Sequence, residues 1–153
     1  KEYIDKTKAG RKIKRWKHPN SNMEKTLYKA CHTGHPSTVW VMQSAYNYHW
    51  LYKHMMALNT EFKMRYGHIS DHKTVQLLEG ALMYPPKNIS LNTIATDPPP
   101  AMPDYCKVPG DSVASYRKYY IYEKQRFATW KSPSSVPAWY IDGVKEAQEQ
   151  ALI

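Results

Sequence analysis

The sequence predicts an all-α protein: a compact bundle of four or five helices, with two long helices and a proline-rich crossing loop. Two long segments carry apolar residues every three or four positions, and most of the 11 prolines lie between them. The chain has 153 residues, 42% of them hydrophobic, which is enough for one core. We therefore expect a basic N-terminal arm over residues 1–22 and a single helical domain over residues 23–153.

Residues 37–66 contain neither glycine nor proline and predict one helix of about eight turns that ends at Gly67. Ser37 or Thr38 should cap its first turn. The face expected in the core is apolar except at Asn59 and consists of Val41, Ala45, Tyr48, Leu51, Tyr52, Met55, Leu58, Phe62 and Tyr66. The opposite face combines aromatic rings with a cation, as nucleic-acid surfaces do, and consists of Gln43, Tyr46, Trp50, Lys53 and Thr60.

Positive charge dominates the chain, with 22 basic and 13 acidic residues and a formal charge of +9. Residues 1–17 alone hold eight of the basic residues and two of the acidic ones. Such charge attracts polyanions through electrostatic steering and counterion release, so we expect a nucleic acid as partner, and double-stranded DNA in particular. The sequence contains no apolar stretch of membrane-spanning length and no signal-peptide pattern, so no membrane partner is expected.

Basic and apolar side chains alternate over residues 12–16, a pattern that is compatible with a short hairpin or with a loop. Two roles are open for this arm. It is either a solvated run of charge, or a grip on nucleic acid in which Trp16 stacks on a base. The cations that would contact phosphates in the second case are Arg11, Lys12, Lys14, Arg15 and Lys17.

Two shorter helices should flank the first long one. The earlier helix, over residues 21–33, should have Ser21 or Asn22 as its cap and should place Cys31 in the core. Asp71 should cap the later helix, residues 72–82, whose apolar stripe consists of Val75, Leu78 and Leu82.

The C-terminal half begins with an irregular but ordered loop over residues 84–110, because its prolines exclude helix and inner strand. Asp111 and Ser112 should cap a second long helix that ends near residue 130. Its buried face should consist of Val113, Tyr116, Tyr120, Phe127 and Trp130. Its flank either contacts phosphates or is half-buried, and consists of Lys118, Tyr122 and Arg126. Two further rings that we expect at a DNA surface, Trp139 and Tyr140, precede a polar helix from about residue 142.

No cofactor or metal is expected. Cys31, His32 and His35 lie close together in the sequence, but a closed zinc site needs four ligands at suitable spacing, so we assign no metal. We expect the two histidines to hydrogen-bond helix ends or to line a polar cleft. The two cysteines lie far apart, which favours a reduced intracellular setting. The sequence contains no phosphate-binding glycine loop, no serine-hydrolase elbow and no paired-carboxylate motif, so no catalytic residue is assigned.

Five short groups of residues follow one another along the chain. They are His35-Pro36-Ser37-Thr38-Val39-Trp40-Val41, Asn47-Tyr48 with Trp50-Leu51, Glu61-Phe62 with Arg65-Tyr66-Gly67, Pro99-Pro100-Ala101-Met102-Pro103-Asp104 and Tyr116-Arg117-Lys118-Tyr119-Tyr120. In this order they resemble an uncharacterised protein family of bacteriophages, cyanophages especially. That family carries a further N-terminal segment, so the resemblance implies that such a segment precedes Lys1 and that the protein acts in the cytoplasm of an infected bacterium.

The helix from His35 to Gly67 and the aromatic pair Trp139-Tyr140 also resemble, more distantly, the pyrimidine-dimer DNA glycosylases of the phage endonuclease V type. The chain departs from that pattern where Tyr66 precedes Gly67. This resemblance implies excision of a damaged base through an imine formed by an N-terminal α-amine, with a carboxylate nearby. The nucleophile would belong to the missing N-terminal segment.

Two functions are open on these grounds. The first is a DNA-binding phage protein that acts as a base-excision glycosylase or lyase on damaged pyrimidines. Flipping a base costs a few kcal/mol, and stacking would offset this cost through Trp16, Trp50, Trp139 and Tyr140. The alternative is a non-catalytic phage accessory protein that binds nucleic acid or a host factor. Glu61, between two basic neighbours, is expected to form an ordinary helix ion pair.

Overall fold

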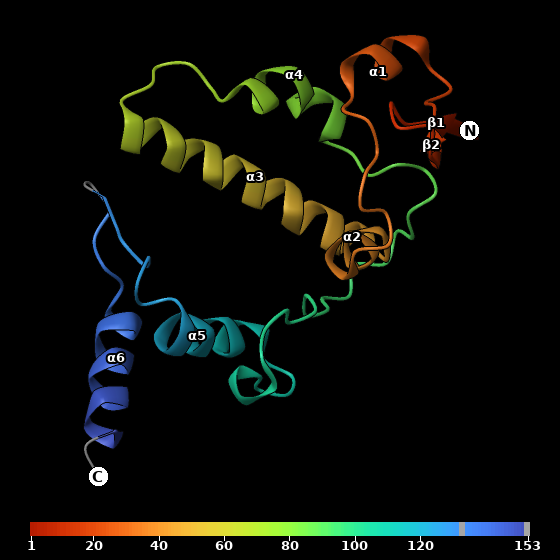
Figure 1. The fold of residues 1–153 in the computed structure, drawn as a ribbon. Helices are drawn as coiled ribbons and strands as arrows, with labels where there is room; N and C mark the ends of the chain where they lie inside the picture. The colour runs from red at the N-terminus through yellow and green to blue at the C-terminus, as the bar shows by residue number, and fades with distance from the viewer. Residues whose placement is uncertain (132–133, 152–153) are drawn as a thin grey trace. The chain divides into compact units, whose positions relative to one another are not determined.

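The computed structural model describes residues 1–131 and 134–151. Within these ranges it contains six α-helices and one two-stranded antiparallel sheet (Figure 1). The protein is therefore mostly helical, as predicted, while its description as a compact bundle stays a prediction. Contacts within the chain divide it into two compact units, the first formed by Lys1–Thr60 with Ile69–Ile94 and the second by Glu61–His68 with Ala95–Ile153.

The first unit begins with a β-hairpin, which is the structure of the basic arm. Strand β1 (Glu2–Lys6) pairs with strand β2 (Lys12–Trp16). The chain reverses between Thr7 and Arg11, whose backbone groups are hydrogen-bonded across the turn at 2.9 Å. Gly10 in this turn has a φ of +77°, a left-handed conformation that glycine adopts without steric cost.

Helix α1 (Ser21–Thr26) is shorter than the sequence predicts. Its cap is Asn20, whose side-chain oxygen accepts two first-turn amides at 2.9 and 3.1 Å, so neither Ser21 nor Asn22 is the cap. The helix ends because Leu27 is extended. Cys31 consequently shares no helical face with α1 and is exposed, so its predicted place in the core is wrong.

The long helix predicted over residues 37–66 is broken in two. Helix α2 (Pro36–Met42) and helix α3 (Ala45–Tyr66) are separated by Gln43 and Ser44. Ser44 is buried, and its side-chain oxygen accepts the backbone amide of Asn47 at 3.2 Å. This bond caps α3, and a serine that caps a helix lies outside its first turn.

The two ends of the predicted helix are set by His35 and Gly67. His35 caps α2, since its Nδ1 accepts the amide of Ser37 at 3.2 Å; neither Ser37 nor Thr38 is the cap. Gly67 has a φ of +64° and ends α3, which confirms the predicted left-handed stop.

Helix α4 (Lys73–Leu82) buries Val75 and Leu78, as predicted. Its cap is His72 instead of Asp71, because the Nδ1 atom of His72 accepts the amide two residues further on at 3.2 Å.

Asn59 joins α3 to the start of α4. It is 6% exposed; its amide nitrogen donates to the carboxylate of Asp71, and its side-chain oxygen accepts the amide of His72, both at 2.8 Å. The one polar residue of the predicted core face is therefore buried with both of its polar atoms bonded.

Burial along α3 follows the predicted faces only in part. Ala45 is buried and Tyr48 is half-buried, with its hydroxyl donating to the carbonyl of Leu82 at 2.8 Å. A helix face is buried only where another element covers it, and α4 meets α3 through Asn59 and Tyr48. The members of the predicted core face that are exposed instead are Leu51, Leu58 and Tyr66.

The second unit contains the 3₁₀ turn η1 (Asp104–Cys106) and the helices α5 (Ser112–Glu123) and α6 (Ala138–Gln150). Asp111 caps α5 as predicted, through the amide of Ala114 at 2.8 Å. Helix α5 stops well before residue 130, because the chain turns at the carbonyl of residue 124. Helix α6 starts before residue 142 and includes both predicted aromatic residues.

The buried residues of the second unit are small. Cys106 and Ser115 are fully buried and Ser112 is nearly so. The hydroxyl of Ser115 accepts the amide of Val108 at 2.8 Å and donates to the carbonyl of Asp111 at 2.8 Å. Helix α5 turns its serines inward, where Ser112 bonds to Pro98 and Ser115 to Val108. The bulky residues predicted for the core are therefore exposed: Val113, Tyr116, Tyr120 and Phe127.

Replacing Asn59 with leucine should destabilise the first unit. Asn59→Leu removes two hydrogen bonds that join α3 to the start of α4, each worth about 1 kcal/mol. Leucine offers no polar atom to replace the bonds that the substitution takes from Asp71 and His72. We expect the free energy of unfolding, measured in urea, to fall by about 2 kcal/mol. The neighbouring exposed position supplies the control, since Leu58→Asn should change it by less than about 0.5 kcal/mol. Equal losses in the two variants would contradict this role of Asn59.

Candidate functional site

A groove of about 570 Å³ runs along the exposed face of α3 in the first unit. One wall is the helix and the other is the loop that follows α4. The residues that line it are Ala45, Tyr46, His49, Trp50, Lys53, Pro85, Leu91 and Thr93. We call it the α3 groove. It contains all three residues that the sequence predicts for DNA contact on this helix.

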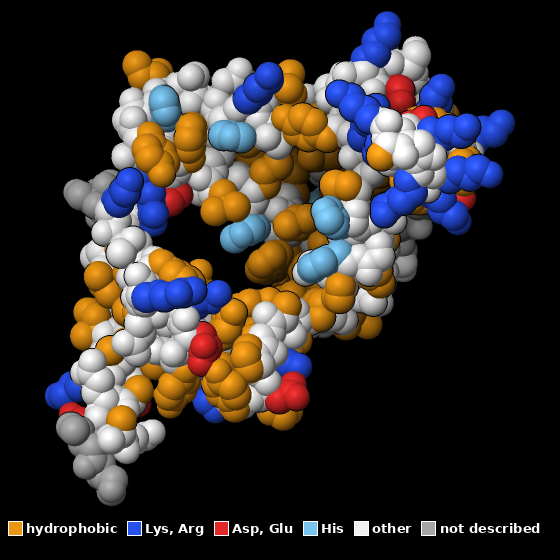
Figure 2. All heavy atoms as spheres, viewed as in Figure 1, with side chains coloured by type: hydrophobic (Ala, Val, Ile, Leu, Met, Phe, Trp, Pro, Cys, Tyr) orange, Lys and Arg blue, Asp and Glu red, His pale blue; other side chains and the backbone are white. Residues whose placement is uncertain are grey.

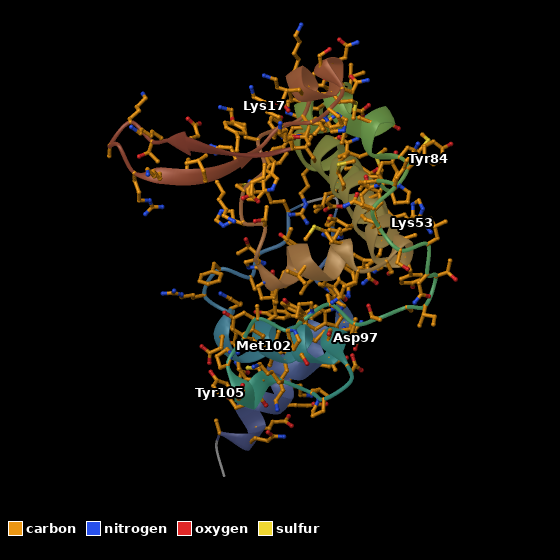
Figure 3. The ribbon with its side chains drawn as sticks, turned by 90° about the vertical axis from the view of Figure 1, so that its right-hand side faces the viewer. Lys17, Lys53, Tyr84, Asp97, Met102 and Tyr105 are labelled. Carbon is orange, nitrogen blue, oxygen red and sulfur yellow. The ribbon has the colours of Figure 1, made fainter. Side chains whose placement is uncertain are left out.

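Backbone hydrogen bonds at the start of α3 build this groove. The first amides of a helix have no acceptor within the helix. Here the amide of Ala45 donates to the carbonyl of Ser90 at 2.8 Å, and the amide of Tyr46 to that of Asn92 at 3.4 Å. Ile89, 6% exposed, anchors the same loop. Figure 3 shows this loop descending from Tyr84 beside α3 and past Lys53.

Trp50 is the central ring of the α3 groove. It meets the buried Trp40 edge to face, with ring centroids 5.6 Å apart, and stacks on His54 at 5.3 Å and 15°. These contacts fix the plane of the indole, yet 44% of Trp50 and 40% of Tyr46 remain exposed. A ring that is held in place and still open to solvent is what base stacking requires.

The hairpin presents two different faces. Opposite residues of an antiparallel pair share a face, so Tyr3 with Arg15 and Asp5 with Ile13 form the half-buried face. The exposed face, which we call the outer hairpin face, consists of Glu2, Ile4, Lys6, Lys12, Lys14 and Trp16.

Three cations of the predicted grip already have partners within the hairpin. Lys14 pairs with Glu2 at 3.1 Å, and Arg15 lies 3.7 Å from the carboxylate of Asp5 on the half-buried face. The ammonium group of Lys17 lies 5.3 Å from the centre of the Tyr3 ring. Within the described chain, no ion pair involves the cations at or next to the turn, Lys6, Lys8, Arg11 and Lys12, or those at the open end of the hairpin, Lys1 and Lys17. Figure 2 shows Lys and Arg side chains gathered over this part of the molecule.

A second groove, of about 410 Å³, lies between α5 and α6 in the second unit. It brings together three predicted residues, Lys118, Tyr122 and Trp139, and the guanidinium of Arg117 lies 5.4 Å from the centre of the Trp139 ring. Its α6 wall is acidic, through Asp142 and Glu146. Mixed charge suits a polyanion less well than the cations without ion-pair partners near the hairpin turn do.

Two predicted residues of the second unit, Arg126 and Tyr140, do not line its groove. Arg126 packs its guanidinium 4.9 Å from the ring of Phe127. The ring of Tyr140 lies 4.8 Å from that of Trp130 and 5.7 Å from that of Trp139. These contacts account for the two residues without a ligand.

Sequence reasoning missed His49, Thr93 and Arg117 as groove residues. His49 lies one turn after Tyr46 and four residues before Lys53, so the helical spacing of the outer face could have included it. Thr93 could not be found in this way, because only the loop's hydrogen bonds to α3 bring it there.

Glu61 forms an ion pair with Arg65 one turn later, as predicted, and also accepts a hydrogen bond from the hydroxyl of Ser134. Both hydrogen bonds lower the pKa of Glu61, the bond from Ser134 more than the bond from Arg65. A carboxylate held ionised in this way is a structural group rather than a general acid.

The second unit contains two other groups with perturbed acidity. The hydroxyl of Tyr105 donates to the carboxylate of Glu123, which raises the pKa of Tyr105 to about 12. Burial raises the pKa of the Cys106 thiol, which keeps it protonated and unreactive at neutral pH. Neither group has the lowered pKa of a nucleophile.

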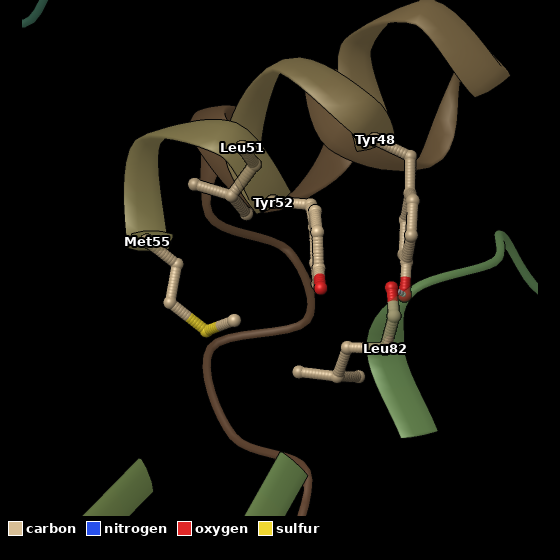
Figure 4. Close-up of a pocket in the computed structure, with 5 residues that line it drawn as sticks. All are labelled: Tyr48, Leu51, Tyr52, Met55 and Leu82. Atoms are coloured by element: carbon tan, nitrogen blue, oxygen red, sulfur yellow. Dashed lines mark hydrogen bonds between the residues drawn. The ribbon is translucent and has the colours of Figure 1, made fainter. Parts of the chain in front are cut away.

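A small apolar pocket of about 150 Å³ lies between α3 and α4 (Figure 4). It is lined by Tyr48, Leu51, Tyr52, Met55 and Leu82. Desolvation raises the pKa of Tyr48, whose hydroxyl is bonded to the Leu82 carbonyl. Apart from the Tyr48 hydroxyl, the side chains that line the pocket offer one polar group, the hydroxyl of Tyr52, and a single hydroxyl does not orient a ligand, so we assign the pocket no function.

Within the described residues, no three histidine, cysteine or acidic side chains come close enough to hold a metal ion. None of the helices in that part of the chain has the length and apolar character to cross a membrane. No protein-family model, no curated protein and no solved structure matches the chain. The resemblances to a phage family and to DNA glycosylases therefore stay predictions.

Gly143 fixes the approach of α6 to α5, so its replacement should disturb the second groove. A Cβ at this position would lie 2.2 Å from Cδ1 and 3.0 Å from Cγ1 of Ile121. We expect Gly143→Ala to lower the free energy of unfolding by about 1–3 kcal/mol, because Ile121 must leave its position. Gly80→Ala in α4, where no atom lies within 4 Å, should instead stabilise by up to about 1 kcal/mol.

A double variant tests the cause of this effect. Ile121→Val removes the Cδ1 atom that the new methyl group would meet, so it should restore most of the stability lost in Gly143→Ala. Urea denaturation of the single and double variants gives the coupling energy. Strictly additive effects would rule out the Ile121 clash.

Proposed function

We propose that this protein binds double-stranded DNA and that the α3 groove receives a base that has left the stack. The observation that supports this most is Trp50, an indole fixed by two neighbouring rings and still 44% exposed, beside the cation of Lys53. Stacking on such a ring is tolerant of base identity and is worth about 1–3 kcal/mol.

The volume and chemistry of the α3 groove are consistent with one nucleotide. Small-molecule sites enclose about 300–1,000 Å³, and the groove falls within that range at about 570 Å³. Trp50 and Tyr46 offer rings to the base, Lys53 offers a charge to the adjacent phosphate, and Thr93 and His49 offer hydrogen-bonding groups for the base edge.

The basic hairpin belongs to the same unit and supports the phosphate contacts. Its unpaired cations, with the overall charge of +9, favour a polyanion over a neutral ligand. Phosphate contacts position a protein on the duplex, while the ring at Trp50 supplies the contact to a base. This division of roles requires no sequence specificity.

Base excision on damaged pyrimidines is the reaction that the glycosylase resemblance implies, in a phage-infected bacterial cell. The α3 groove supplies a place for a flipped base but no carboxylate among its lining residues. We therefore propose binding for these residues and assign them no chemical step. A phage accessory protein that binds nucleic acid without catalysis has the same groove and hairpin and differs only in lacking the reaction. Borohydride trapping on ultraviolet-damaged DNA separates the two, since only an imine-forming enzyme gives a covalent adduct.

Binding to duplex DNA should depend strongly on salt. About five phosphate contacts correspond to a slope of about −4.5 in a plot of log affinity against log salt concentration. Fluorescence anisotropy of a labelled duplex measures this slope. The salt concentration is varied from about 50 to about 200 mM, over which the affinity of such a protein changes strongly. A slope near zero would rule out DNA as the partner.

Removing the ring of Trp50 should weaken DNA binding more than folding. We expect Trp50→Ala to reduce affinity for a duplex that contains an unpaired nucleotide by about tenfold, corresponding to about 1.4 kcal/mol of lost stacking. The salt slope should not change, because no cation is lost. Leu58→Ala, on another face of the same helix and 56% exposed, is the matched control and should bind as the unmodified protein does.

The opposite pattern would assign Trp50 to the core. A large drop in melting temperature together with unchanged affinity would show that the ring serves packing against Trp40 alone.

A further inference from the structure

The strand register of the hairpin places two lysines directly opposite each other. Lys6 is the partner of Lys12 at the end of the ladder next to the turn. Both lie on the outer hairpin face, and no acidic side chain of the described chain pairs with either. Like charges at directly opposite positions destabilise an antiparallel pair.

The rest of the hairpin makes this pair conspicuous. Its two acidic residues are used elsewhere: Glu2 pairs with Lys14, and Asp5 faces Arg15 on the half-buried side. Lys8 and Arg11 in the turn add two more cations without ion-pair partners among the described residues. A two-stranded hairpin is marginally stable by itself. A sequence selected for hairpin stability alone would not concentrate unneutralised charge beside its turn, so this charge points to an external anion.

The outer hairpin face also exposes apolar groups between its cations. Ile4 is 59% exposed in the middle of β1, and Trp16 is 38% exposed at the open end. A surface built only to hold a polyanion would not need them. Apolar side chains contact thymine methyl groups, and these lie in the major groove of a duplex.

The dimensions of a two-stranded ribbon match that groove. Paired strands lie about 4.8 Å apart, and the major groove of B-DNA is about 12 Å wide, which admits one two-stranded ribbon with its side chains. The minor groove, about 6 Å wide, does not. The turn, Thr7–Arg11, would lie at the leading end of such a ribbon.

From this geometry we propose that the β1–β2 hairpin enters the major groove of duplex DNA with its outer face toward the bases. Lys6 and Lys12 contact the phosphates or base edges near the turn, and Ile4 contacts base methyl groups between the strands. The proposal rests on the proposed DNA-binding function and gives the hairpin a role distinct from that of the α3 groove. The anion that relieves the repulsion between Lys6 and Lys12 is therefore the duplex itself.

A charge reversal separates binding from folding at this position. Lys6→Glu creates a cross-strand ion pair with Lys12, so the hairpin should be at least as stable as in the unmodified protein and the melting temperature should not fall. Affinity for a duplex should nevertheless fall by about tenfold or more, and the salt slope should decrease by about 1–2, because one or two phosphate contacts are lost. Lys73→Glu at the start of α4 makes the same change in net charge and should leave the slope within about 0.5.

Chemical probing identifies the groove. Bound protein should protect guanine N7, which lies in the major groove, from methylation by dimethyl sulfate, and leave adenine N3, in the minor groove, reactive. Lys6→Glu should lose that protection. Protection of adenine N3 alone would overturn the proposal, as would equal affinity of Lys6→Glu and Lys73→Glu.

Other partners and the proposed function give distinguishable results. Tighter binding of the unmodified protein to phosphatidylserine vesicles than to a duplex, with the same loss in Lys6→Glu, would assign the outer hairpin face to a lipid surface. Affinity that is lost in Trp50→Ala but unchanged in Lys6→Glu would leave the α3 groove as a DNA site and refute the hairpin's role. Absence of any duplex binding by the unmodified protein would refute the proposed function itself.

Discussion

The free backbone amides at the start of α3 are the constraint on which the first unit depends. A helix that begins in the interior must find acceptors for its first amides, and here they come from the side chain of Ser44 and the carbonyls of Ser90 and Asn92. These bonds separate α2 from α3 and hold the proline-rich loop against the helix. The α3 groove is a direct consequence, because its second wall is that loop.

Hydrogen bonds between buried polar groups position the elements in both units. Asn47 is fully buried and donates to the carbonyl of Trp40 at 2.8 Å, which orients α2 against α3, and Asn59 does the same for α3 and α4. Ser115 plays the corresponding part beside η1. Buried polar groups that are fully bonded specify one arrangement of their elements more strictly than apolar contacts do, because misplacement leaves a donor or acceptor unpaired.

The interface that we propose combines two kinds of surface within one unit. The hairpin supplies charge that its own acidic residues do not neutralise, and the α3 groove supplies rings that are fixed but not covered. Neither surface improves the folded state by itself: like charges repel across the strands, and exposed indole forgoes burial. Both features are explained if a nucleic acid completes them, with phosphates at the hairpin and a base at Trp50.

The local features of this protein could be predicted from its amino-acid sequence. Helical periodicity predicted helices at the positions of α3, α4 and α5, and Gly67 predicted the left-handed end of α3. The spacing of Tyr46, Trp50 and Lys53 predicted that these three side chains share one exposed face. Only the fold shows the break at Ser44, the hydrogen-bond partners of Asn59 and the exposure of Cys31. Helical spacing treats Ser44 and Asn59 as ordinary helix positions. It carries no information on hydrogen-bond partners that are distant in the chain, such as Ser90 and His72. For the same physical reason the loop wall of the α3 groove, and the pairing of Lys6 with Lys12, emerged only from the fold.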